Sequence, residues 1–322
     1  MPRKNSTHKK ANPEPKITSQ ADDREKIPTG LYSLDAALGG GLPTNAVTEI
    51  YGWAGSGKTT LLYYLMGKVN PAGKIALCET ENGFDAKWAK SLLQRSGFYG
   101  ELKSTNYFKM EKGKKAPIPD DDRLDRLFED FSEPEYSVVA LDSVGGYMPT
   151  AEAEGDTTDA LMGLRARQMA KFMRKAAYYM RYKPCPCHGF VITHMHAILG
   201  GRGVSTIGGD TITYLSSTRI RLSAGSGDEK EEDGSMIVRG KFDKLRFRQA
   251  SEGAVFQLYF KAGYGIHPGL SAVLDAIAYE LATKENGTVK MKGKSYGRFS
   301  KMLEQANDDD LFQPFQQALE KM

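Results

Sequence analysis

A glycine-rich turn between an apolar strand and an apolar helix constrains this chain most. Residues 47–62 read VTEIYGWAGSGKTTLL, and residues 52–59 match the pattern G-x-x-x-x-G-K-[ST]. In this pattern the glycines free backbone N–H groups to hold phosphate oxygens at the start of a helix. Lys58 would reach the β- and γ-phosphates, and the Thr59 hydroxyl would bind Mg²⁺. The flanking strand and helix patterns argue against a chance glycine turn, so we expect a nucleotide site.

The predicted nucleotide contacts follow the motif residue by residue. They are Gly52, Trp53, Ala54, Gly55, Ser56, Gly57, Lys58, Thr59 and Thr60.

Short apolar strands alternate with amphipathic helices around this turn. Strands are expected at 47–51, 75–78, 136–142 and 190–193, and helices from residue 59, after residue 85 and over 163–181. Such alternation predicts βαβ units and therefore an α/β fold with a mostly parallel twisted sheet flanked by helices.

Carboxylates stand where two of these strands end, which is where parallel sheets place their ligands. Asp142 ends the strand at 136–142, and we expect it to be the second Mg²⁺ contact of a P-loop NTPase. Glu79 and Glu81 follow another strand. Glu81 could polarise the water that attacks a γ-phosphate; alternatively it could cap the following helix, a task that Asp85 could share.

Composition limits the class of protein and its compartment. The 322 residues suit one large domain with an appendage, or two domains. There is no apolar run near the ~20 residues of a membrane span, and the first ten residues have no apolar segment of a secretory signal. Cys78, Cys185 and Cys187 give no disulfide framework. We therefore expect a cytoplasmic protein without a membrane partner.

Pattern changes along the chain predict three parts. Residues 1–22 are polar and rich in lysine, and read as a basic flexible tail that either touches nucleic acid or is simply solvated. Residues 23–268 form the predicted core. Residues 269–322 contain a helix at 271–282, a short β-like stretch and a terminal helix, and read as a small C-terminal α/β lobe.

Two long loops and several basic segments suggest a polymeric ligand. The polar stretch 149–162 and the glycine-rich stretch 197–210 lie beside the same predicted sheet. In the helix between them, Arg167, Lys171 and Arg174 fall at helical spacing and would suit phosphates, or would form a solvated basic face. Basic residues at 239–248 either reach a neighbouring subunit's nucleotide or line an exposed strand edge.

Two further segments carry less weight. The sequence CPCH at 185–188 invites a zinc interpretation, but its spacing fits neither common pattern of paired ligands, so a proline turn is favoured. Residues 223–235 are strongly acidic and read as a solvated hairpin tip.

Several segments together resemble the RecA family of recombinases, and its bacterial and phage branch in particular. They are GLPTNAVTEIYGWAGSGKTTL, ETENGFDAKWAK, ALDSVGGYMPTAEAEGD with MGLRARQMAKFMRK, and GGDTITYLSSTRIRL. The resemblance runs from about residue 27 to about residue 298. It implies a RecA-like core and an ATP-dependent recombinase, using ATP and Mg²⁺, in a bacterial or phage-infected cell. Such a protein forms helical filaments on single-stranded DNA and exchanges strands with homologous duplex.

The resemblance also implies roles for individual residues. Glu81 would activate the attacking water, and Trp88 would stack on the adenine. His194 stands where the family has a glutamine that couples the γ-phosphate to DNA, and Lys244 matches a lysine that reaches across the filament interface. With Lys58, these residues except Trp88 form the predicted catalytic set. The implied DNA contacts are Met162, Arg167, Arg174, Leu199, Arg202, Gly208 and Gly209.

Two other functions share such a core. A hexameric helicase-type motor would be a second enzyme, and a nucleotide-binding recombination mediator or regulator would act without strand exchange. DNA-stimulated ATP hydrolysis, filaments or rings would separate the three hypotheses.

Overall fold

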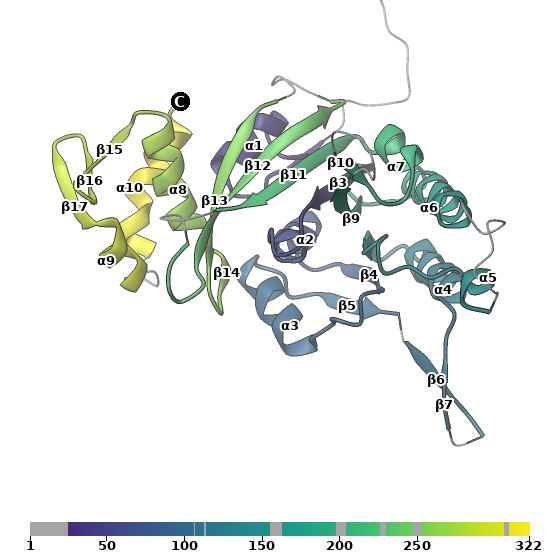
Figure 1. Cartoon of the computed structure of the whole chain (residues 1–322). Helices are drawn as coiled ribbons and strands as arrows, with labels where there is room; N and C mark the ends of the chain where they lie inside the picture. The colour runs from purple at the N-terminus through teal and green to yellow at the C-terminus, as the bar shows by residue number, and fades with distance from the viewer. Residues whose placement is uncertain are drawn as a thin grey trace, which may run out of the picture.

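One ten-stranded sheet forms the centre of the described part of the computed structural model (Figure 1). The structure describes residues 25–105, 107–112, 114–154, 163–197, 204–225, 230–247, 253–305 and 309–322. The strand order is β14-β13-β12-β11-β3-β9-β8-β4-β5, with β10 beside β9. The run from β11 to β5 is parallel throughout, whereas β12, β13 and β14 continue it antiparallel. This arrangement confirms the predicted α/β fold with a mostly parallel sheet.

The strands of this sheet have the following bounds. They are β3 (Ala46–Gly52), β4 (Lys74–Glu79), β5 (Glu101–Ser104), β8 (Tyr136–Asp142), β9 (His188–Ala197), β10 (Val204–Thr206), β11 (Thr218–Ala224), β12 (Met236–Leu245), β13 (Val255–Lys261) and β14 (Gly265–Ile266).

Helices cover both faces of the sheet because its central strands are apolar on both sides. In β8, Val138 and Ala140 belong to one buried cluster, and Val139 and Leu141 belong to the other. The first cluster is completed by α1 (Tyr32–Leu38), α2 (Lys58–Val69) and α3 (Ala86–Arg95). The second is completed by α4 (Asp120–Ser132), α6 (Leu164–Met180) and α7 (Asp210–Leu215). The sheet is therefore the middle of three layers.

Local signals explain where several helices begin and end. Helix α1 ends at Gly39, whose φ of 69° is the left-handed conformation that glycine adopts readily. Asp85 caps α3 by accepting the N–H groups of Lys87 and Trp88. The capping alternative for Glu81 is therefore wrong.

The C-terminal segment, residues 268–322, packs on the face of β13 that carries Tyr259. It contains α8 (Pro268–Ala278), α9 (Phe299–Glu304), α10 (Asp309–Glu320) and a small antiparallel sheet of β15 (Ala282–Glu285), β16 (Thr288–Met291) and β17 (Lys294–Arg298). These elements share a buried cluster with Tyr259 of β13. The helix predicted to reach residue 282 stops earlier, because Glu280 has a φ of 60° and Ala282 already begins β15.

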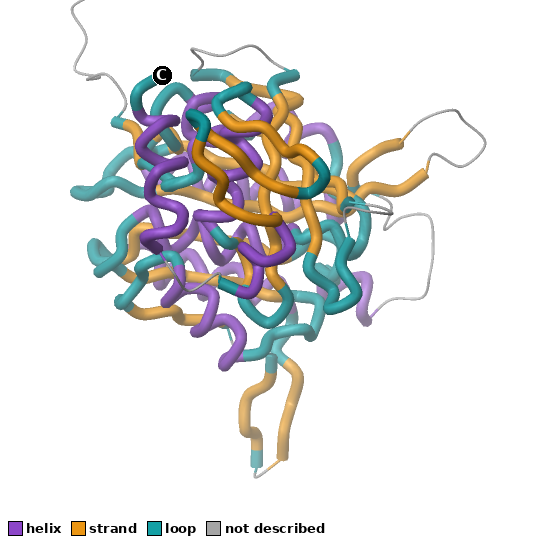
Figure 2. Tube along the Cα trace, turned by 90° about the vertical axis from the view of Figure 1, so that its left-hand side faces the viewer, coloured by secondary structure: helices purple, strands orange, loops and turns teal. Residues whose placement is uncertain are grey.

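A two-stranded hairpin projects from the body of the molecule between β5 and α4. No sequence pattern predicted it. It consists of β6 (Phe108–Glu111) and β7 (Lys114–Pro117), and both views show it extending outward (Figures 1 and 2). The remaining short elements are β1 (Lys26–Ile27), β2 (Leu42–Pro43) and α5 (Thr150–Glu154). No helix among the described residues is long and apolar enough to cross a membrane.

Candidate nucleotide and DNA site

The predicted phosphate loop connects β3 directly to the start of α2. Gly55 and Gly57 have φ values of 72° and 84°, which favour glycine. A side chain at Gly52 would place its Cβ atom 2.4 Å from the carbonyl oxygen of Leu222, so this position also requires glycine. The buried Ser56 Oγ has no hydrogen-bond partner within the described structure. An unpaired buried hydroxyl inside such a loop fits a phosphate ligand.

Lys58 is almost fully buried at the beginning of α2. Its Nζ atom donates to the carbonyl oxygen of Trp53 at 2.9 Å, so the side chain folds back over the loop. Burial lowers the pKa of Lys58, while nearby Glu81 and Asp142 act in the opposite direction. The ammonium group is therefore held over the loop that would receive the phosphates.

Thr59 and Asp142 meet as the metal hypothesis requires. Thr59 Oγ1 donates to Asp142 Oδ2 at 3.0 Å. Asp142 is 4% exposed, and burial raises the pKa of its carboxyl group to about 7. A cation beside a buried carboxylate would stabilise the charged form, so this hydroxyl and carboxylate fit Mg²⁺. The described residues contain no cluster of three or more His, Cys, Asp or Glu that could hold a metal ion by themselves.

Glu81 forms hydrogen bonds with His194 of β9 and with Ser143, which directly follows β8. Its Oε1 atom lies 2.6 Å from His194 Nε2 and also accepts the hydroxyl of Ser143. The pKa of Glu81 is lowered to about 2, mainly by the hydrogen bond from His194, while burial acts against this. Glu81 is thus a carboxylate at neutral pH and is able to accept a proton or orient a water molecule.

Glu79 supports the segment that carries Glu81. Its Oε1 atom accepts the backbone N–H groups of Glu81 at 2.9 Å and Gly83 at 3.2 Å. Thr80 Oγ1 donates to the carbonyl oxygen of Ser143 at 2.6 Å and accepts the Ser143 N–H at 3.0 Å. The end of β4 is therefore fixed to the end of β8.

Trp88 lies in the wall of a small cavity of about 90 Å³ beside this centre. Thr59, Tyr63, Glu81 and Asp142 line the same cavity. Trp88 is partly buried and packs against the first core cluster. Its position is next to the predicted metal pair, whereas the adenine contact itself stays a prediction.

Helix α6 presents the predicted basic residues on its exposed side. Met169, Phe172 and Met173 are buried, whereas Arg167 and Arg174 are exposed and pair with no carboxylate in the described structure. Lys171 instead lies 3.7 Å from a carboxylate oxygen of α4, so the predicted stripe is partly neutralised. Met162, Leu199 and Arg202 lie outside the described residues.

Gly208 and Gly209 have a packing role whether or not DNA binds. Gly208 has a φ of 111°, and a Cβ atom there would lie 2.6 Å from Val144 and 2.7 Å from Ile212. Gly209 has a φ of 81° and approaches Ala166 of α6. These glycines allow the end of the second loop to pack against α6 and the segment after β8.

Lys244 lies near the end of β12, opposite Arg219 of β11, which in turn pairs with Glu49 of β3. Its Nζ atom donates to the carbonyl oxygens of Thr213 at 2.8 Å and Tyr214 at 2.9 Å, near the end of α7. The structure therefore places Lys244 away from the loop of its own chain, and a contact to a neighbouring subunit stays a prediction.

Cys187 and His188 have structural roles within the core. Cys187 Sγ donates to Asn45 Oδ1 at 3.0 Å, and both ring nitrogens of the buried His188 are hydrogen-bonded, to Thr48 Oγ1 and to the Pro43 carbonyl. Burial lowers the pKa of His188 to about 4. Neither side chain is arranged as a zinc ligand.

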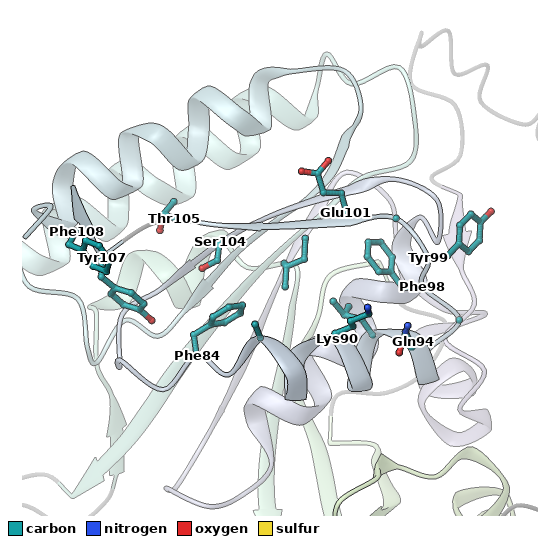
Figure 3. A pocket seen from close by; sticks show the side chains of 15 residues that line it. Phe84, Lys90, Gln94, Phe98, Tyr99, Glu101, Ser104, Thr105, Tyr107 and Phe108 are labelled. Carbon is teal, nitrogen blue, oxygen red and sulfur yellow. The ribbon is translucent and has the colours of Figure 1, made fainter. Parts of the chain in front are cut away.

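A much larger hollow, of about 1080 Å³, lies between α3 and the edge strand β5 (Figure 3). Phe84, Leu93, Phe98 and Leu102 contribute apolar surface to it. Figure 3 shows Phe84 on the α3 side and Ser104 on the β5 side of the hollow. The hollow is distinct from the phosphate loop.

Sequence reasoning missed Ser143 and Thr80, which join the ends of β8 and β4. The sequence did offer a signal. In both places a hydroxyl residue directly follows the acidic residue that ends the strand, at Glu79-Thr80 and at Asp142-Ser143. Such pairs suggest side-chain hydrogen bonds between strand ends, but the strand order is needed to show which ends are neighbours.

Comparison with known proteins places these features in one family. A family model described as the RecA N-terminal domain matches residues 16–96 and 127–264. Protein RecA of Gloeobacter violaceus is 30% identical over 293 residues, covering 89% of this chain and 73% of that protein. Protein RecA of Francisella philomiragia is 29% identical over 282 residues, covering 86% and 74%. The crystal structure of the RadB recombinase shares the fold, with a TM-score of 0.52, 20% identity, and coverage of 74% of this chain and 98% of that one.

Proposed function

Because the chain belongs to the RecA family, we propose that it is a DNA-dependent ATPase that forms filaments on single-stranded DNA and catalyses homologous pairing and strand exchange. A recombination role at the level of the family follows from membership itself. The DNA dependence, the filament and the exchange of strands are the proposed parts.

One observation carries the proposal: a single carboxylate contacts the strand ends that lead into both predicted DNA loops. Ser143, at the end of β8, precedes the loop 149–162, and His194, on β9, precedes the loop 197–210. The backbone carbonyl of His194 also accepts the N–H of Ile207, a residue of the second loop, at 3.2 Å. DNA that moves either loop would therefore change the surroundings of Glu81.

The residues of the site divide the work of ATP hydrolysis. Thr59 and Asp142 would hold Mg²⁺, which supplies positive charge that offsets the charge of the phosphates. Lys58 and the backbone N–H groups of residues 52–59 bind phosphate oxygens. Glu81 accepts a hydrogen bond from the attacking water and orients it. His194 and Ser143 hold the carboxylate of Glu81 in place.

The decisive experiment measures ATP hydrolysis with and without single-stranded DNA. The wild type should be stimulated, and Glu81→Gln should bind ATP but lose the stimulated rate. His196→Gln is a control with an unchanged rate expected, because this exposed histidine lies on β9 beyond His194 and forms no hydrogen bond or ion pair with Glu81 in the described structure. Negative-stain images of the same samples should show helical filaments.

Other outcomes point to the competing functions. ATP binding without stimulation or filaments would favour a recombination mediator or regulator. Ring-shaped particles with ATP-driven unwinding would favour a hexameric helicase-type motor.

Filament assembly has a candidate surface on the molecule. Strand β5 is the last strand of the sheet order, so its outer backbone groups are free to pair with another chain. The hollow beside it has both apolar and polar lining residues, and the buried Ser104 Oγ and Tyr107 OH have no hydrogen-bond partner in the described structure. We propose that a second copy of this chain fills it. Ser104→Arg should prevent filaments while leaving ATP binding intact, whereas normal filaments in this variant would contradict the assignment.

A further inference from the structure

The hairpin β6–β7 concentrates positive charge on a projecting arm. Residues 108–117 contain four lysines and one glutamate. Lys109, Lys112, Lys114 and Lys115 are all exposed, and Glu111 pairs with Lys109 at 2.7 Å. A net positive arm of this kind is suited to a polyanion.

The two faces of the hairpin differ in chemistry. Because opposite residues share a face, Phe108 and Met110 lie with Lys115 and Pro117 on one side. Phe108 is 43% exposed and Met110 is 62% exposed, and the ammonium group of Lys115 lies 4.2 Å from the centre of the Phe108 ring. An isolated two-stranded hairpin is marginally stable in water, so a partner that covers it would stabilise it. Basic and apolar side chains together are typical of surfaces that bind nucleic acid strands.

The base of the hairpin is fixed to the nucleotide side of the molecule. The N–H of Ile118 donates to the carbonyl oxygen of Tyr107 at 2.9 Å and closes the base. The guanidinium group of Arg123 lies 4.4 Å from the Tyr107 ring centre and also donates to the carbonyl oxygen of Glu79. Arg123 is 3% exposed, so the contact that joins the base of the hairpin to the end of β4 is buried.

The same junction is fixed to the entry of the first predicted DNA loop. Asp120 accepts the N–H of Met148 at 2.8 Å, and Asp121 accepts the N–H of Thr150 at 2.8 Å as well as the hydroxyl of Tyr147. Figure 1 shows the hairpin leaving the molecule next to α4 and α5, which flank this entry. The base of the hairpin and residues 147–150 are therefore both held by residues at the start of α4.

The hairpin lies outside the residues that the family model matches. The family model matches residues up to 96 and resumes at 127, so the whole hairpin falls in the unmatched interval.

We propose that the β6–β7 hairpin is an accessory arm that binds the backbone phosphates of DNA beside the first DNA loop. The proposal rests on the proposed DNA-binding function and adds a contact surface outside the family core. The phosphates belong either to the strand in the filament or to the incoming duplex.

The test replaces all four lysines of the hairpin with glutamine in the full-length chain. Anisotropy of a fluorescein-labelled 60-nucleotide single strand and of a 60-base-pair duplex is measured with ATP and Mg²⁺ between 50 and 200 mM salt. The slope of log K against log salt is negative. Each lost phosphate contact reduces its magnitude by about 0.9 on duplex and about 0.7 on a single strand. We expect at least a tenfold loss of affinity for one of the two DNA forms. The magnitude of its salt slope should fall by about 2, which corresponds to about two or three lost phosphate contacts.

Two control variants distinguish an effect of the hairpin lysines from an effect of the protein's total charge. The four-lysine-to-arginine variant keeps the charge and should bind like the wild type. Replacing Lys284, Lys290, Lys292 and Lys294 with glutamine removes the same charge from the small C-terminal sheet. An equal loss in this control would overturn the proposal, as would unchanged binding of both DNA forms by the hairpin variant.

The outcomes also distinguish this proposal from the proposed function. If the wild type is stimulated by DNA and forms filaments while the hairpin variant binds both DNA forms normally, only the arm is refuted. If the wild type binds DNA through the hairpin without stimulated hydrolysis, the arm stands and the recombinase proposal fails. A wild type that binds neither DNA form would refute both.

Discussion

The buried carboxyl group of Asp275 allows a quantitative prediction about stability and pH. Asp275 lies on α8, is 3% exposed, and accepts the backbone N–H of Ser33 at 3.1 Å. Burial raises the pKa of Asp275 to about 6, against an ordinary value of 3.8. No cation lies among the causes of this shift, so the charged form of the carboxyl group is disfavoured in the folded protein.

The sign and size of the effect follow from this difference. Below pH 3.8 both the folded and the unfolded chain hold the proton, so stability is unaffected. As the pH rises toward 6, the unfolded chain releases the proton first, and the folded state loses stability. The gap between 3.8 and about 6, at 1.36 kcal/mol per pKa unit, gives a penalty of about 3 kcal/mol above pH 6.

Asp275→Asn should remove this penalty while its amide oxygen still accepts the Ser33 N–H. Urea unfolding at pH 7.5 should show a gain in the free energy of unfolding of up to about 3 kcal/mol. At pH 4 the gain should nearly vanish. Asp310→Asn, an exposed site on α10, is the matched control and should change little at either pH. An equal gain at both pH values, or a loss at pH 7.5, would refute the reasoning.

Three further predictions concern the sheet and the nucleotide loop. Arg219→Met should lower the free energy of unfolding in urea by about 3–5 kcal/mol. Glu49 is fully buried, and its Oε2 atom would lose the Arg219 Nε donor at 2.5 Å; a decrease below about 1 kcal/mol would contradict this. Gly57→Ala should abolish ATP binding in a fluorescent nucleotide assay, because its Cβ atom would lie 2.3 Å from the Phe260 ring at a φ of 84°; normal affinity would show that the loop can shift. His194→Ala should lower the DNA-stimulated rate of hydrolysis, because the Glu81 carboxylate loses a hydrogen-bond partner at 2.6 Å; an unchanged stimulated rate would remove the idea.

The central strands were predictable because they are apolar on both faces. In β8 and β9 continuous runs such as SVVAL and FVIT leave little choice of structure. Strand β5 and the hairpin were not predicted, because edge and projecting strands carry polar residues on exposed faces and resemble loops. Helix α4 was readable in principle, since Leu124, Leu127, Phe128 and Phe131 are buried at helical spacing.

The sequence was enough to predict which residues near the phosphate loop lie together, such as Thr59 and Asp142. It was less informative about the hydrogen bonds between them. Thr59 and Asp142 could be paired because a phosphate-loop hydroxyl and a strand-end acid meet in this class of sheet. The meeting of Glu81 with His194 and Ser143 depends on the order β9-β8-β4, which no local pattern encodes. Lys244 shows the same limit, because only the tertiary structure reveals its contacts with α7.

The position of β3 in the sheet has a consequence for synthesis of the protein. This strand carries the phosphate loop, yet its neighbours are β9 and β11, whose residues are translated about 140 to 170 positions later. At 5–20 residues per second, a nascent chain would wait roughly 10 to 30 s before β3 had both partners. Phe260, which packs against Gly57, emerges later still. A truncated product that ends before β11 would therefore lack one of the two strands that hold β3, so ATP could stabilise only chains that extend past β11.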